Sequence, residues 1–345
     1  MRCVVTAFAI VAFFVAPSYA GLPSAMEFSS LDSISKWMAN YRTKPNPARL
    51  PAAVRAMAQF GLFKEPESAG VYVGFIAGVL GANPDRAEEL VGKMLPMPAA
   101  DEWVFVRAIA YSNHPEWQNW LRKFAERLPS RKVMIEKYLA GKLPTLYEIP
   151  LERNNPNLWD RARGYFVKDA HANAASDISF DRSPELLDTL WGYYFATGFT
   201  QPVDRIISFL PWAKERDSVD KLTMGSMAKY TLASNAARDA ELLAHLKNAS
   251  KSAPKQTASV LNEAIEAAET METTRLRKDA LAAIEELKRK GPGYKRDVST
   301  WGQIGQGALA LGCIVAATTG HVELGLPCII TGAASSATLN YWNTN

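Results

Sequence analysis

Few side chains in this sequence stand at the spacings that enzyme chemistry requires. The spacing Ser-x-x-Lys, which lets a lysine amine activate a serine nucleophile, occurs at Ser33 to Lys36 and at Ser226 to Lys229. The Lys-Thr-Gly sequence that accompanies it in acyl-transfer enzymes is missing, and both surroundings have the apolar spacing of helices. The sequence also contains no Gly-x-Ser-x-Gly turn, no His-Glu-x-x-His pair and no phosphate-binding or dinucleotide-binding loop. We therefore expect neither an enzyme nor a cofactor.

One polar stretch has residue types that could bind a divalent cation. His171 stands close in sequence to Asp169 and Asp177, and carboxylate oxygens are ligands that such cations prefer. Alternatively, these aspartates cap helices and turns, which is the commoner use of aspartate in a polar loop. We predict no resident metal, and we keep these three residues as the metal candidates.

The first 20 residues have the pattern of a cleaved export signal. A short basic start precedes the apolar residues 3–15, and Ser18 and Ala20 are small residues at the positions that a signal peptidase reads. We predict cleavage after Ala20 and an exported protein, periplasmic or extracellular and associated with the cell envelope. The alternative, an uncleaved anchor, needs a longer apolar run than Pro17 leaves.

Charge and cysteine content narrow the class of partner. The chain carries 39 basic and 35 acidic residues, an excess too small to favour nucleic acid. After removal of the leader, Cys313 and Cys328 are the remaining cysteines, and such a pair in an oxidising compartment predicts one disulfide. We expect a protein or peptide partner.

Apolar residues recur at helical spacing through most of the chain, which predicts an all-α fold. Two segments, near residues 66–128 and 183–249, share landmarks in the same order. Val73-Gly74-Phe75 matches Trp191-Gly192-Tyr193, and in both segments a proline follows the glycine by ten residues. The later landmarks are Leu95-Pro96 with Leu210-Pro211, Ala110-Tyr111-Ser112-Asn113 with Leu232-Ala233-Ser234-Asn235, and Trp120-Leu121 with Leu242-Leu243. We predict duplicated helical hairpins within residues 21–249; the alternative is that packed hairpins share such features without duplication.

The helix boundaries follow from proline, glycine and capping residues. The predicted helices run near 30–41, 50–60, 66–80, 84–95, 103–110, 115–128, 132–139, 158–167, 185–196, 202–210, 219–234 and 240–247. Nine tryptophans invite a sugar-binding interpretation, because indole faces stack on sugar rings. Most of them fall on the apolar stripes of these helices, so we expect them to fill the core.

The alternation of short helical hairpins over Pro66 to Lys247 resembles the tetratricopeptide and Sel1-like class of helical repeats. The family pattern Trp-x-x-Leu-Gly-x-x-Tyr is not present and the copies here are longer, so no ligand position carries over. The resemblance implies an α-solenoid-like fold with a concave surface that holds a peptide or partner protein. We expect the partner in the groove between the copies.

Two segments complete the predicted domain organisation. Residues 250–296 are charged and Ala-rich at helical spacing, which predicts a helical arm that Gly291-Pro292-Gly293 ends. From Val298 to the last residue the chain carries one formally charged side chain, Glu323, so residues 297–345 are predicted to form an uncharged Gly/Ala-rich helical hairpin. Folding back brings Cys313 and Cys328 towards one another.

This tail supplies the alternative hypothesis for function. Gly312 belongs to a ridge of small residues spaced by four, and Trp301, Tyr341 and Trp342 bracket the apolar stretch as interfacial aromatic residues do. The two uncharged runs of the hairpin, Ile304 to Thr319 and Leu324 to Leu339, are each sixteen residues long, which is shorter than a comfortable bilayer span. The first hypothesis is an exported scaffold that binds a protein or peptide. The alternative is a membrane-associated or membrane-inserting protein that acts through residues 298–345.

Overall fold

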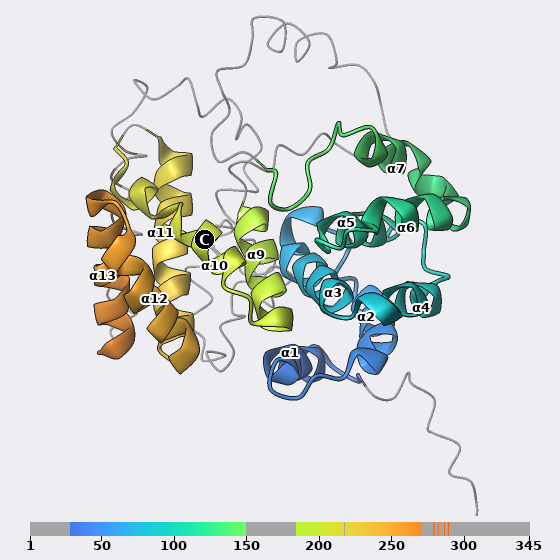
Figure 1. The fold of residues 1–345 in the computed structure, drawn as a ribbon, viewed down its shortest axis with the longest axis horizontal. Coiled ribbons are helices and arrows are strands. Elements are labelled where there is room, and N and C mark those ends of the chain that lie inside the picture. Colours follow the sequence, from blue (N-terminus) through green and yellow to red (C-terminus); the bar gives the residue numbers. More distant parts are fainter. Residues whose placement is uncertain are drawn as a thin grey trace, which may run out of the picture.

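The computed structural model describes residues 28–149, 184–216 and 218–270, together with four isolated positions beyond them. Within these ranges the chain forms helices joined by turns and contains no strand, which confirms the predicted all-α fold. Helices α3 (Gly70–Ala82) and α9 (Pro184–Thr197) lie side by side in the middle of the molecule (Figure 1). The helices of the N-terminal part lie on one side of this pair, and those after residue 200 lie on the other.

Short helices make up the N-terminal part, close to the predicted boundaries. They are α1 (Leu31–Tyr41), α2 (Leu50–Gln59), α4 (Pro84–Met94), α5 (Trp103–Tyr111), α6 (Trp117–Phe124) and α7 (Lys132–Leu139). Ser30 starts α1 as predicted, because its side chain accepts a hydrogen bond from the Ser33 amide in a capping box. Single turns of 3-10 helix at Pro47–Arg49, Pro66–Ser68, Ala125–Arg127 and Pro129–Arg131 connect these helices.

The C-terminal part also consists of helices joined by turns, and apart from the short α10 its helices are longer than those of the N-terminal part. They are α10 (Gln201–Ile207), α11 (Val219–Ala236), α12 (Ala240–Ser252) and α13 (Lys255–Glu269). Asp239 begins α12, where its carboxylate accepts hydrogen bonds from the amides of Glu241 and Leu242. Helix α10 ends earlier than predicted, because residues Leu210–Lys214 form a 3-10 helix of their own.

Helix α3 is the centre of the core, as its apolar sequence predicts, and the side chains from Val71 to Leu80 are buried. Helix α3 runs parallel to α9, and the backbones of the two helices are in contact. A methyl group on Gly74 would lie 1.9 Å from the carbonyl oxygen of Thr189, and one on Gly192 would lie 2.1 Å from the carbonyl oxygen of Val71. Glycine at both positions is therefore what allows the two helices to approach so closely.

Two local predictions were wrong. Asn83 precedes Pro84, and such a position predicts that its side chain caps α4; the side-chain amide instead donates to the Val79 carbonyl at 2.8 Å, at the end of α3. Pro66 begins a single 3-10 turn rather than the long helix, which starts at Gly70. Helices α3 and α9 are in backbone contact, so no groove lies between these two helices; the partner groove stays a prediction.

Several predictions concern residues outside the described ranges. These are the signal peptide (residues 1–20), the helix near 158–167, the metal candidates Asp169, His171 and Asp177, the arm after residue 270, the cysteines Cys313 and Cys328, and the tail residues Trp301, Gly312, Tyr341 and Trp342. In the part that is described, no helix has both the length and the hydropathy needed to cross a membrane.

Candidate functional site

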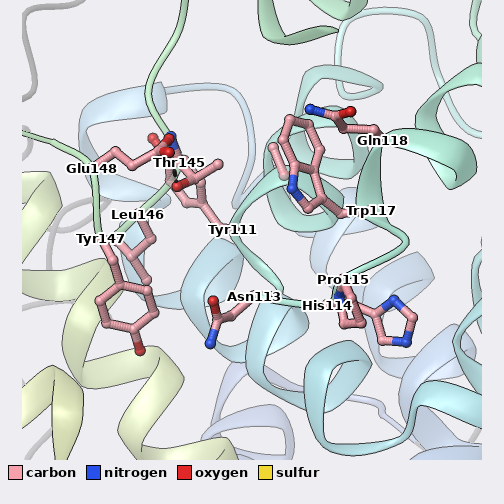
Figure 2. A pocket seen from close by; sticks show the side chains of 11 residues that line it. Tyr111, Asn113, His114, Pro115, Trp117, Gln118, Thr145, Leu146, Tyr147 and Glu148 are labelled. Carbon is pink, nitrogen blue, oxygen red and sulfur yellow. Dashed lines mark hydrogen bonds between the residues drawn. The ribbon is translucent and has the colours of Figure 1, made fainter. Parts of the chain in front are cut away.

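A pocket of about 300 Å³ opens where α5 turns into α6. We call it the α5–α6 pocket; it is lined by Ala110, Tyr111, Asn113, His114, Pro115, Trp117, Gln118, Thr145, Leu146, Tyr147 and Glu148. Trp117 and Gln118 lie on one side of the opening, residues 145–148 lie on the other, and Tyr111 lies between them (Figure 2). The pocket thus combines aromatic rings, side-chain amides and one carboxylate.

The turn between α5 and α6 forms one wall. Asn113 adopts a left-handed backbone conformation with φ of 56°, which reverses the chain after α5. The His114 ring stacks on Trp120 with centroids 3.9 Å apart, and its Nδ1 accepts the Glu116 amide at 3.0 Å. Burial lowers the pKa of His114 below its usual value, so the ring is neutral at neutral pH.

The opposite wall is the segment that follows α7. Leu146 and Ile149 are buried and anchor it to the core, while Tyr147 is half-buried. Arg205 of α10 donates hydrogen bonds to the carbonyl oxygens of Tyr147, at 3.1 Å, and of Ile149. The guanidinium thereby fixes the path of a segment that has no regular structure of its own.

The base of the pocket belongs to a buried polar network. Tyr111 shares a hydrogen bond with Tyr138 of α7, and Tyr138 in turn bonds Arg107. Arg107 forms an ion pair with Glu185 of α9 at 2.6 Å, with only 7% and 1% of the two side chains exposed. Burial is the largest single effect and lowers the pKa of Arg107, but Glu185 together with Tyr111 and Tyr138 outweighs it and leaves the pKa raised. This network joins α5, α7 and α9 under the pocket.

Glu148 is held at the rim in its ionised form. The backbone amide and the hydroxyl of Thr145 both donate to Oε2 of Glu148, at 2.9 and 2.8 Å. These two hydrogen bonds lower the pKa of Glu148 below its usual value. The spacing Thr-x-x-Glu is that of a capping box, so the sequence carries the signal for this turn, although nothing in it points to a pocket.

Asp188 is a second buried acid near the centre of the molecule, and within the described part of the chain its carboxylate has no hydrogen bond or ion pair. It lies on α9 with 7% of its surface exposed, near Tyr72 of α3. Burial raises its pKa from 3.8 to about 7. The folded protein therefore holds this proton more tightly than the unfolded chain does.

The stability of the protein should accordingly depend on pH through Asp188. Because the pKa of Asp188 is raised in the folded state, its contribution to the free energy of unfolding is complete below about pH 4 and is lost as the pH rises towards 7. The whole contribution is roughly 4 kcal/mol. In the Asp188→Asn variant, stability should no longer fall over this pH range. Urea unfolding at a series of pH values measures it, and parallel curves for the two proteins would contradict the prediction.

The two Ser-x-x-Lys pairs serve other purposes. Ser33 belongs to the cap of α1, and Lys36 forms an ion pair with Asp32 at 2.8 Å. Lys229 forms an ion pair with Glu263 of α13. The described residues also contain no group of three or more histidine, cysteine or acidic side chains placed to hold a metal ion.

The tryptophans within the described residues divide between the core and the pocket. Trp37, Trp103, Trp120, Trp191 and Trp212 are buried, as their positions on apolar stripes predict. Trp117 was expected in the core with them, but it is only half-buried and lines the α5–α6 pocket. The sequence pattern could not separate it, because its place on the stripe of α6 is the same as that of a core residue.

Comparisons of the chain with protein-family models, with curated proteins and with solved structures give no match. The α5–α6 pocket and the helices around it are therefore the basis for a proposed function.

Proposed function

We propose that the protein is an exported α-helical scaffold that binds a protein or peptide partner at the cell envelope. The observation that carries this proposal is the α5–α6 pocket, in which Trp117 and Tyr147 reach solvent while Tyr111 and Leu146 of the same pocket are buried. Half-exposed aromatic residues in a preformed hollow are typical anchor points of protein interfaces. Export is inferred from the leader sequence.

The frame suits such a role because the pocket is held from several directions. Tyr147 packs edge-on against Tyr193 of α9, with centroids 6.1 Å apart. The Tyr193 hydroxyl donates to the Ser112 carbonyl at 3.1 Å, next to the turn that forms the other wall. Both walls are thus attached to α9, so a ligand would meet a site whose shape is already set, which reduces the entropic cost of binding.

A pull-down with the mature chain tests the proposal. Chain beginning at Gly21 is incubated with envelope extract at several salt concentrations, and the recovered proteins are compared for Trp117→Ala and for Phe199→Ala, an exposed aromatic outside the pocket. We expect a saturable partner whose affinity falls about tenfold or more with Trp117→Ala, as for an interface hot spot. Phe199→Ala should retain the partner. Recovery of no saturable partner, or equal loss with both variants, would contradict the proposal.

The alternative function, membrane association, concerns residues 298–345. The observation in its favour is that Glu323 is their only formally charged side chain. Flotation with liposomes distinguishes the two hypotheses when the mature chain is compared with one that ends at Gly293. Flotation of the longer chain alone would favour the membrane hypothesis. If neither chain floated, the result would favour partner binding at the α5–α6 pocket.

We further propose that residues 66–128 and 183–249 are copies of one unit related by a pseudo-twofold axis. Such an axis requires reciprocal contacts between equivalent residues. Gly74 meets Thr189, three residues before Gly192, and Gly192 meets Val71, three residues before Gly74. The matched order of helices and the shared Val73-Gly74-Phe75 and Trp191-Gly192-Tyr193 positions support the same conclusion.

A further inference from the structure

The α5–α6 pocket carries a negative charge that no positive charge in its lining balances. Among the described residues that line it, Glu148 is the only one that is charged at neutral pH, because burial keeps His114 neutral. Arg205 runs behind the same segment, but its guanidinium bonds the carbonyl oxygens of Tyr147 and Ile149 rather than the carboxylate. The pocket therefore presents a single negative charge with no lining cation to balance it.

The position of the Glu148 carboxylate leaves it ready for a ligand. Both hydrogen bonds from Thr145 fall on Oε2, and within the described part of the chain Oε1 has no partner. Figure 2 shows the carboxylate beside Thr145 on the side of the opening that faces Trp117. A group that enters the pocket would meet a fixed anion on one side and an indole ring on the other.

Aromatic rings and a carboxylate together attract a cation. Ammonium and guanidinium groups bind to aromatic faces and form charge-assisted hydrogen bonds with carboxylates. The pocket supplies the rings of Trp117 and Tyr147 and the amide oxygens of Asn113 and Gln118, which accept hydrogen bonds. Its volume of about 300 Å³ lies at the small end of ligand sites and suits one side chain rather than a folded segment.

We infer that the α5–α6 pocket binds the basic side chain of a lysine or arginine in the partner peptide. The inference rests on the proposed function and specifies its ligand. A neutral sugar could use the same rings and amides, but it would not need the unbalanced charge of Glu148. The Glu148 carboxylate is therefore the group that should select the ligand.

Titration of the mature chain with small probes tests the inference. The probes are Nα-acetyl-lysine methylamide, Nα-acetyl-arginine methylamide, the norleucine analogue, which lacks the amine, and methyl β-glucoside. Binding is followed by the NMR signals of the Trp117 indole N–H, assigned with Trp117→Phe, and of the Thr145 amide. We expect the lysine and arginine probes to shift both signals saturably, and we expect the other two to leave them unchanged.

Two matched variants identify the charge that is responsible. Glu148→Gln keeps an oxygen that accepts from Thr145, so the turn should persist, while the charge is lost. Glu126→Gln removes the charge of an exposed glutamate that does not line the pocket. Glu148→Gln should weaken the lysine probe about tenfold, the size expected for losing one charge-assisted hydrogen bond, and Glu126→Gln should not change it.

Several outcomes would overturn the inference. These are equal binding of the norleucine and lysine probes, binding of the glucoside alone, no shift with any probe, or equal effects of the two glutamate variants. The pull-down separates this result from the proposed function. A partner recovered equally by the wild type and by Glu148→Gln, with no probe bound, would remove the inference and leave the function. If the lysine probe bound but no partner were recovered, the proposed function would be removed and the preference of the pocket for a basic group would remain.

Discussion

Replacing Gly74 by alanine should destabilise the protein by about 3 kcal/mol or more. The added methyl group would lie 1.9 Å from the Thr189 carbonyl oxygen, and no rotation of a side chain can relieve a clash with backbone. Helices α3 and α9 would have to move apart in the centre of the core. Urea or thermal unfolding of the mature chain measures the loss, and Gly192→Ala should give a loss of similar size because its clash with Val71 is 2.1 Å.

The control for this prediction is Gly92→Ala in α4. A methyl group there would have Arg127 Nη1 as its nearest neighbour, at 3.8 Å, so it meets ordinary contact. Alanine favours the helix over glycine by about 1 kcal/mol, and this variant should be as stable as the wild type or slightly more stable. If Gly74→Ala and Gly92→Ala were equally stable, the close approach of α3 and α9 would be wrong.

Breaking the buried ion pair between Arg107 and Glu185 should destabilise the protein by a similar amount. Glu185→Gln or Arg107→Met leaves one charge without its partner in a site that is almost closed to solvent, and we expect either variant to lose about 3 to 5 kcal/mol in unfolding experiments. The double variant Arg107→Met with Glu185→Leu removes both charges. It should be less destabilised than either single variant, because no uncompensated charge stays buried.

An exposed ion pair provides the comparison. Lys123 and Glu88 join α6 to α4 with 59% and 48% of their side chains exposed. Solvent screens such a pair, so Glu88→Gln should change stability by less than about 1 kcal/mol. A loss of that small size with Glu185→Gln as well would show that Arg107 and Glu185 do not hold α5 to α9.

The helices could be predicted from sequence because their signals are local. Lys132–Leu139 and the starts of α11 at Val219 and α12 at Ala240 follow the predicted boundaries, since apolar period, capping residues and prolines act within one or two turns. Asn83 was assigned wrongly for the same reason. Its position before a proline allows two uses, and only the packed structure decides between them.

The packing of α3 against α9 could be predicted from the sequence only in part. The matched glycines Gly74 and Gly192 are visible in the sequence, but that they meet one another's helix depends on long-range packing. The ion pair between Arg107 and Glu185 was missed entirely. Glu185 sits in the first turn of α9, where an acidic residue interacts favourably with the helix dipole, so its position in the sequence gives no sign of a distant cation.

The α5–α6 pocket could not be predicted because its walls come from distant segments. Trp117 follows the turn after α5, whereas Glu148 lies on an irregular segment that Arg205 of α10 holds in place. No periodicity connects these three residues. Their types are ordinary for a helical surface, so only their placement in space points to binding.

The most direct test of the account is photo-crosslinking from the pocket itself. A benzophenone amino acid is placed at Gln118, which lines the pocket, and separately at Phe199, which is 55% exposed outside it. Both mature proteins are irradiated in envelope extract. The account predicts a specific adduct from position 118 that an excess of unlabelled protein prevents, and no such adduct from position 199. Equal labelling from both positions, or none from position 118, would contradict it.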